Sequence, residues 1–324
     1  MVVIDPNKNL TKELRILADF YKKKGDTWRA TSYAKAIVTI QNLDFKLKTK
    51  AEAMQLPGIG KGIAEKIEEF TKSKKIRKVG SVQKEDKLLK KRGGPKLRAT
   101  DAFEKIWGVG PIKAKNLYNL GYKSITDLRK TGQKHLTAQQ LIGLKYYTAL
   151  QAEIPRARIT KFQNKVLKLI DSVCNKDQYR FEVAGSYRRK KKTSGDIDCV
   201  LASKNFTLKE FVDLLKAAGI IVETLTESKK GEKFMGVADL DGQIVRLDIE
   251  FVKDVEKSWW TTLVYFTGSK GFNIALRNEA KKRGYKLDQH SLMRLKDFKD
   301  VKIKSEKELF NLLGFSYLPP EKRG

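Results

Sequence analysis

The chain has 324 residues, of which 40% are hydrophobic, and a formal net charge of +30 at pH 7. This length allows more than one small domain, and so positive a charge favours a polyanionic partner, either nucleic acid or an anionic membrane surface. No apolar run approaches the roughly 20 residues that span a bilayer, so we expect nucleic acid and no membrane association. Two cysteines, Cys174 and Cys199, provide no disulfide framework and indicate a reducing, intracellular compartment.

The first half of the chain has the apolar spacing of helices. Segments such as "TKELRILADFYKKKG" and "TWRATSYAKAIVTI" place apolar residues three and four apart, and residues 96–153 resume this pattern. Between them, residues 71–92 carry ten Lys or Arg against two acids, followed by "RGGPK". We interpret the first part of this run as a tail and connection, with a domain boundary near 85–95.

Two glycine turns repeat one pattern in this helical half. "LPGIGKGIAEKI" at 56–67 and "IWGVGPIKAKNL" at 106–117 share a hydrophobic-x-Gly-hydrophobic-Gly sequence before a helix. Glycine permits positive φ and close approach of the backbone, and the following helix offers free N–H groups to a phosphate. An ordinary tight turn explains one copy equally well, but two copies in so basic a chain favour binding of the DNA backbone. The glycines concerned are Gly58, Gly60, Gly108 and Gly110.

The second half changes from helical spacing to alternation with a period of two. "RFEVAGS", "DIDCVLA", "KFMGVADL" and "QIVRLDIEFV" predict strands, and helices are expected near 159–174 and 207–218. In the last of these strands Val245, Leu247, Ile249 and Phe251 would form the buried face. This half is therefore expected to be an α+β domain.

Three aspartates lie on the side of these strands that is opposite the apolar face. Asp196 and Asp198 are two residues apart and point the same way, and Asp248 joins them if the two strands are neighbours. Pairing with nearby lysines is the simpler explanation for a lone Asp-x-Asp. Three clustered carboxylates, however, repel one another unless a cation lies between them, and oxygen ligands favour Mg²⁺. Two such ions can activate an attacking hydroxyl and stabilise the leaving phosphate oxygen.

Together, "GSYRR…SGDID", "VRLDIEF" and "LVYFTGSKGFNIALR" resemble family X DNA polymerases, the family of the beta and lambda enzymes, over nearly the whole chain. The resemblance implies a multidomain α+β protein. Its parts would be a helical 5′-deoxyribose-phosphate lyase-like domain (1–88), a helical fingers-type DNA-binding subdomain (89–153), an α+β nucleotidyltransferase palm (154–257) and a small α+β thumb that selects the nucleotide (258–324). The two glycine turns would be helix-hairpin-helix motifs.

The resemblance also implies roles for individual residues. The three aspartates would be catalytic and bind two Mg²⁺ ions, for which Mn²⁺ can substitute. Backbone carbonyls at the two turns would hold Na⁺ or K⁺. Arg246 would touch the primer and Arg277 the template. The nucleotide-binding residues would be Arg156, Ser186, Arg189, Gly195, Tyr265, Phe266, Gly268 and Asn273, and the cation-binding carbonyls those of Leu56, Ile59, Ile106 and Val109.

In the N-terminal domain the resemblance places Lys66 at the position of a catalytic lysine that forms a Schiff base with an abasic sugar. Most lysines in such a chain simply supply positive charge, so this role depends on the motif alone. The DNA-binding residues around it would be Trp28, Arg29, Tyr33, Lys35 and Lys61.

This chain departs from the vertebrate repair enzyme of the family at several of these positions. Gly62 replaces a phosphate-contacting lysine, which puts the efficiency of the lyase in doubt. Glu250 replaces an arginine, and Gln289 replaces the glutamate that pairs with it, so the conformational switch assigned to that pair does not carry over. Lys270 replaces an aspartate near the incoming base.

We therefore expect a monomeric, template-directed, gap-filling DNA polymerase of base excision repair, acting on gapped or nicked DNA and deoxynucleoside triphosphates alongside partners such as a DNA ligase. It would act in the nucleus of a cell, or in the cytoplasm or virion of a virus. The alternatives are a template-independent terminal nucleotidyltransferase, a polymerase whose lyase domain only binds phosphate, and a non-catalytic DNA-binding protein. The short turn in "ADLDGQIV" speaks against the first, because terminal-transferase relatives carry a long loop there.

Overall fold

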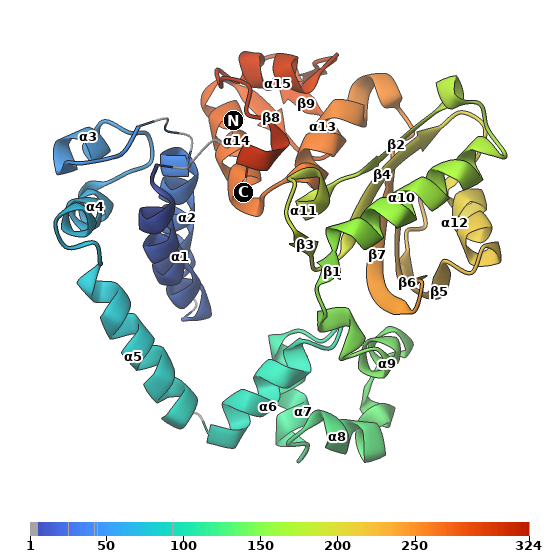
Figure 1. Ribbon diagram of the computed structural model, residues 1–324, viewed down its shortest axis with the longest axis horizontal. Coiled ribbons are helices and arrows are strands. Elements are labelled where there is room, and N and C mark those ends of the chain that lie inside the picture. Colours follow the sequence, from blue (N-terminus) through green and yellow to red (C-terminus); the bar gives the residue numbers. More distant parts are fainter. Residues whose placement is uncertain (1–5, 25, 42, 44, 93, 324) are drawn as a thin grey trace. The chain divides into compact units, whose positions relative to one another are not determined.

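The computed structural model describes residues 6–24, 26–41, 43, 45–92 and 94–323 (Figure 1). The chain divides into two compact units. One comprises Met1–Arg92, Ser269–Asn278 and Lys322–Gly324, and the other Gly93–Gly268 and Glu279–Glu321. The four-part division expected from the sequence stays a prediction. In the described part of the chain, no helix combines the length and apolar character needed to cross a membrane.

The first unit is built from helices α1 (Lys8–Lys23), α2 (Thr27–Gln41), α3 (Lys50–Met54), α4 (Lys61–Ser73) and α5 (Arg77–Arg92). Its core is apolar and closely packed: Leu14, Leu17, Ile40 and Ile67 are fully buried. Helix α5 corrects one expectation, since the basic run from residue 77 onward is helical and not a connection. Val79 and Val82 of α5 are buried in the same core, so two valines provide the apolar face of this highly charged helix.

The second unit begins with a helical part. It contains α6 (Gly94–Glu104), α7 (Pro111–Asn119), α8 (Ile125–Asp127), one π-helical turn (Leu128–Gly132), α9 (Ala138–Lys145), and 3₁₀ turns at Gln133–His135 and Ala149–Gln151. Phe103, Ile106, Leu117 and Leu128 form its core.

A five-stranded sheet follows, with strand order β2-β4-β7-β6-β5. The strands are β2 (Tyr179–Val183), β4 (Ile197–Ser203), β5 (Ile221–Glu227), β6 (Lys233–Leu240) and β7 (Gln243–Phe251). Strands β4 and β7 run parallel, whereas the other neighbours are antiparallel. Two short strands, β1 (Ile154–Pro155) and β3 (Thr193–Ser194), pair beside it.

Helices cover both faces of this sheet. Helices α10 (Arg156–Asp171) and α12 (Leu208–Ala217) pack against the face that carries Leu247 and Ile249, as the alternation predicted (Figure 1). Helix α13 (Val255–Thr267) packs against the opposite face through Trp259 and Leu263, which contact Val200 and Ala202. Because side chains alternate along a strand, the even-numbered residues of β4, Asp198 among them, belong to the α13 face.

The chain ends in a smaller α+β region. It contains α14 (Lys270–Lys282), an antiparallel sheet of β8 (Tyr285–Leu287), β9 (Leu292–Arg294) and β10 (Lys299–Asp300), helix α15 (Glu306–Leu312), and a 3₁₀ turn at Pro320–Lys322.

Candidate active site

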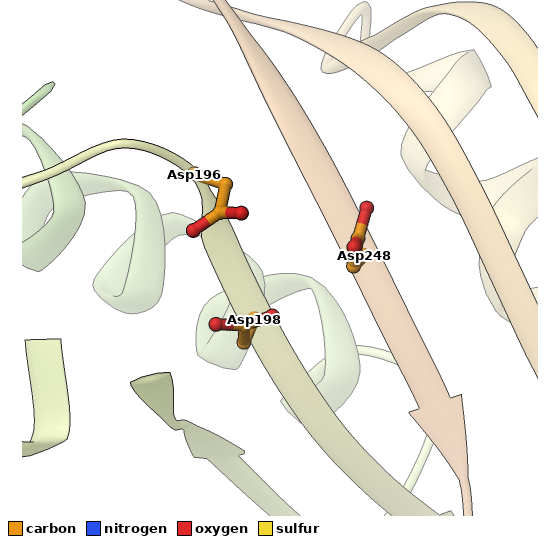
Figure 2. Close-up of side chains that lie close together, drawn as sticks. All are labelled: Asp196, Asp198 and Asp248. Atoms are coloured by element: carbon orange, nitrogen blue, oxygen red, sulfur yellow. The ribbon is translucent and has the colours of Figure 1, made fainter. Parts of the chain in front are cut away.

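The three aspartates meet where β4 and β7 lie side by side (Figure 2). The parallel register sets Asp198 opposite Asp248, and Asp196 immediately precedes β4 on the same side. One oxygen from each carboxylate lies within 4.8 Å of the others. The sheet register thus brings together the residues that the sequence placed on two separate strands.

The electrostatics of this cluster are those of carboxylates that need a cation. Burial, and then the charge of Asp248, raises the pKa of the Asp198 carboxyl to about 7, and burial also raises the pKa of Asp248. Arg246 supplies the nearest compensation: its guanidinium pairs with Asp196, and its Nε lies 3.3 Å from Asp248 Oδ1 without forming a hydrogen bond. This all-oxygen set with an unsatisfied buried oxygen fits a hard divalent ion such as Mg²⁺.

A glycine turn lies against the aspartates. Gly185 begins the four-residue helix α11 (Gly185–Arg188) with φ +53°, where the sequence had suggested a continuing strand. A Cβ at this position would lie 3.2 Å from Asp198 Cγ and closer still to its carboxylate oxygen, so only glycine fits. The turn therefore brings the backbone after β2 directly beside the carboxylate of Asp198.

The side chains after this glycine are held by residues that the sequence did not single out. Ser186 Oγ donates a hydrogen bond to Ser194 Oγ (2.7 Å). Arg189 Nη1 donates to the carbonyl oxygen of Thr267 (2.5 Å), and burial lowers the pKa of the Arg189 guanidinium. Ser194 and Thr267 have ordinary residue types, so only their position in the fold reveals these contacts.

Arg156 and Gly195 lie in the same unit as the aspartates. Arg156 Nη1 donates to the carbonyl oxygen of Tyr187 (2.5 Å), and the guanidinium stacks 4.1 Å from the centre of that ring. Gly195 directly precedes Asp196, and a Cβ there would meet no atom within 4 Å.

The "YFTGS" segment ends helix α13. The rings of Tyr265 and Phe266 meet edge to face at 5.4 Å, and Gly268 ends the helix with φ +68°. These three residues share a unit with the aspartates. Asn273 and Arg277 lie on the part of α14 that belongs to the first unit, and the structure does not place them relative to the aspartates.

Lys66 lies on α4 in the first unit, half-buried, with its Nζ donating to the carbonyl oxygen of Gly62 (3.0 Å). In the described part of the unit, no hydrogen bond or ion pair joins Lys66 to the aromatic or basic residues expected beside it. Arg29 is held by Asp26 at 3.0 Å, Tyr33 is buried with its pKa raised to about 12 mainly by desolvation, and Trp28 is 75% exposed.

The two glycine turns have the same backbone conformation. Gly58 and Gly108 have φ values of +81° and +80°, and Gly60 and Gly110 precede the first residues of α4 and α7. In each turn the first carbonyl accepts from the residue three positions on: Leu56 from Ile59 (3.3 Å) and Ile106 from Val109 (3.0 Å). Lys61 begins α4 and is exposed, and a Cβ at Gly58 would lie 3.8 Å from Lys35 Cβ, so Lys35 lies beside the first turn.

Glu250 and Gln289, the two residues expected to depart from the family pattern, contact each other. Glu250 is buried, and Gln289 Nε2 donates to its Oε1 at 3.3 Å, while the second oxygen has no partner among the described residues. Burial raises the pKa of Glu250 to about 7. The sequence identified both substitutions, and the structure shows that the two new residues contact each other.

Comparison with known families places four models along the chain in order. They are a helix-hairpin-helix domain (5–76), the fingers domain of DNA polymerase lambda (101–151), the DNA polymerase beta palm (153–254) and the DNA polymerase beta thumb (262–324). The chain belongs to family X of the DNA polymerases. The palm and thumb models include the aspartate cluster and the "YFTGS" segment respectively, so this family X chain carries its carboxylates within the matched palm.

Curated relatives agree with this family. The chain is 31% identical to DNA polymerase lambda of Rattus norvegicus and 29% identical to that of Arabidopsis thaliana, over 98% of this chain in both cases. It covers 56% and 62% of those proteins, so it spans little more than half of their length. A DNA nucleotidylexotransferase of Xenopus laevis is 23% identical, with 98% of this chain and 68% of that protein covered.

Proposed function

We propose that this family X chain is a template-directed, gap-filling DNA polymerase of the base excision repair type. The observation that carries the proposal is the juxtaposition of Asp196, Asp198 and Asp248 with the glycine turn at Gly185. The reaction is attack of a primer 3′-hydroxyl on the α-phosphate of a deoxynucleoside triphosphate. A phosphodiester bond forms and pyrophosphate leaves.

The residues of the chain divide this work between the two ends of the nucleotide. The aspartates would hold two Mg²⁺ ions, which supply charge neutralisation and activation of the hydroxyl when bound. Ser186 and Arg189, oriented by Ser194 and Thr267, offer donors to the triphosphate. Arg156, Gly195, Tyr265, Phe266 and Gly268 would complete the nucleotide site.

The short connection between β6 and β7 supports template dependence over terminal transfer. Only Asp241 and Gly242 lie between the two strands, both with positive φ, as a tight hairpin requires. The nucleotidylexotransferase relative keeps terminal transfer as the second candidate, which a single-stranded primer would reveal.

A second activity belongs to the first unit. We propose that the Lys66 amine attacks the aldehyde of a 5′-deoxyribose phosphate and forms a Schiff base with loss of water. Removal of a C2′ proton then breaks the C3′–O bond, the downstream strand leaves with a 5′-phosphate, and water hydrolyses the Schiff base to free Lys66. Trp28, Arg29, Tyr33, Lys35 and Lys61 would hold the DNA end. The turn carbonyls would hold a monovalent cation against the backbone, a role favoured by the matching geometry of the two turns.

One substrate tests both activities. A one-nucleotide gapped duplex with a 5′-deoxyribose phosphate is incubated with Mg²⁺ and deoxynucleotides, then trapped with borohydride, using wild type, Asp248→Asn and Lys66→Ala. We expect insertion to be lost only in Asp248→Asn and the covalent adduct only in Lys66→Ala. Insertion without any wild-type adduct would leave a polymerase whose first unit only binds phosphate. Absence of insertion with Mg²⁺ or Mn²⁺ would refute the polymerase assignment.

A further inference from the structure

A cleft of about 520 Å³ lies in the first unit, away from the glycine turn and Lys66. It is formed by the start of α1, the segment around residues 46–47 and the end of α4. Its apolar base includes Leu10, Leu47 and Phe70, which are at most 8% exposed. Its rim is cationic and consists of Lys8, Lys12, Lys46, Lys74 and Lys75.

Among the residues that the structure describes, no acid forms an ion pair with the charges of this lysine cleft. None of the five lysines forms an ion pair with a described residue, whereas Lys24, Lys50 and Lys72 of the same unit pair with glutamates. The acid that lines the cleft, Glu13, accepts a hydrogen bond from the backbone N–H of Ile76 (3.1 Å). Five exposed ammonium groups around one hollow repel one another, so the cleft favours an occupant with several negative charges.

The walls of the cleft are fixed by specific contacts. Asn7, which is 3% exposed, donates to the carbonyl oxygen of Phe45 (2.8 Å) and accepts from the N–H of Leu47 (3.0 Å). This amide joins the start of α1 to the segment that carries Lys46. Two hydrogen bonds of Asn7 thus fix two walls of the cleft relative to each other.

At the end of α4, a lysine of the cleft rim adopts a backbone conformation that is unfavourable for it. Lys74 caps this helix with φ +57°, a left-handed conformation that costs a non-glycine residue about 1–2 kcal/mol and is usually taken by glycine. Its Nζ donates to the carbonyl oxygen of Thr71 (2.9 Å), which also lines the cleft. A lysine with a strained backbone therefore stands at the rim, in a position where glycine would be more stable.

The distance along α4 relates the cleft to DNA. Lys66 and Lys74 are eight residues apart, which corresponds to about 12 Å of helix rise. Phosphates of one strand in duplex DNA advance by about 3.4 Å each, so a strand that ran along α4 would bring its third or fourth phosphate from Lys66 to the cleft. Resting on the proposed function, in which Lys66 meets the 5′ end, we propose that the lysine cleft binds the phosphate backbone of the downstream strand about three nucleotides from that end.

The test measures binding of the full chain to a one-nucleotide gapped duplex by fluorescence anisotropy over a range of salt concentrations. The variant is Lys12→Ala/Lys46→Ala. The matched control is Lys22→Ala/Lys84→Ala, which removes the same charge from exposed positions of the unit outside the cleft. The slope of log K against log salt is negative, and each lost phosphate contact reduces its magnitude by about 0.9. We therefore expect the magnitude to fall by about 2 in the variant and by much less in the control.

A second DNA locates the contact. Neutral methylphosphonate linkages at positions two to four of the downstream strand should weaken binding of the wild type and the control, but leave the affinity of the cleft variant unchanged. An unchanged slope in the variant, or an additive loss on the modified DNA, would overturn the proposal. The proposal would also be overturned if the cleft variant bound DNA as well as the wild type does but lost binding to phosphatidylserine vesicles or to inorganic polyphosphate. Nucleotide insertion on the same duplex is scored separately, so failure of the polymerase assignment is distinguishable from failure of the cleft.

Discussion

Replacing Gly185 by alanine should damage the aspartate cluster, because the new methyl group would collide with the carboxylate of Asp198. The new Cβ would lie 3.2 Å from Asp198 Cγ and well inside normal contact distance of its Oδ2. Relieving that contact requires the carboxylate or the turn to move by on the order of 1 Å, and displacements of this size at a reacting centre cost about 100-fold in rate. The positive φ of +53° adds about 1–2 kcal/mol of backbone strain.

Gly219→Ala is the matched control. Gly219 also has positive φ (+69°), but a Cβ there would meet no atom within 4 Å. Urea unfolding should show a loss of about 1–2 kcal/mol in the control and at least as much in Gly185→Ala. Single-turnover insertion, measured over a Mg²⁺ titration, should show a rate about 100-fold lower and a weaker apparent affinity for Mg²⁺ only in Gly185→Ala. Normal insertion in Gly185→Ala, or an equal loss in both variants, would refute the reasoning.

Further predictions concern pH and stability. Because the folded pKa of Asp198 is raised to about 7, the native state binds the extra proton, and the metal-free free energy of unfolding should fall as pH rises from about 4 through 7. Added Mg²⁺ should therefore raise the melting temperature more at pH 8 than at pH 6, and an equal rise at both would contradict this. The pKa of Glu250 is also raised to about 7, so its buried carboxyl destabilises the native state only when it is charged, above that pH. Urea unfolding should therefore find Glu250→Gln more stable than wild type at about pH 8.5 and little changed at about pH 5. Phe298 is 74% exposed with φ +55°. Phe298→Gly would relieve about 1–2 kcal/mol of left-handed strain against about 0.5–1 kcal/mol for the greater backbone entropy of glycine, so it should stabilise the chain by about 0.5–1 kcal/mol, and calorimetric destabilisation would count against the strain.

The palm was predictable because its strands obey a simple alternation. Val245, Leu247 and Ile249 form the buried face, and this alone fixes the side to which Asp248 points. The pairing of β4 with β7 was an assumption at the sequence level, since periodicity does not determine which strands are neighbours. The register Asp198 to Asp248 came from the fold.

Other features depend on contacts between distant residues. Helix α5 was missed because its charge hides an apolar face of two valines, Val79 and Val82, although lysine itself favours helices. Strand β2 ends at Val183, two residues before Gly185, and the need for glycine at Gly185 comes from Asp198, whose carboxylate leaves no room for a side chain there. Ser194 has no local signal at all, because its partner Ser186 is recognisable only in three dimensions.

The pairing of Arg246 with Asp196 has a consequence for the order in which the site fills. This guanidinium partly offsets the charge of the carboxylates and occupies one oxygen of Asp196, so a divalent ion that takes that oxygen as a ligand must displace it. Metal occupancy and release of Arg246 are then two sides of one equilibrium, and the coupling is reciprocal. Any DNA phosphate that draws Arg246 away strengthens metal binding by the same factor by which the metal strengthens that DNA contact. Arg246 thus couples the binding of a DNA phosphate to the binding of the metal ion.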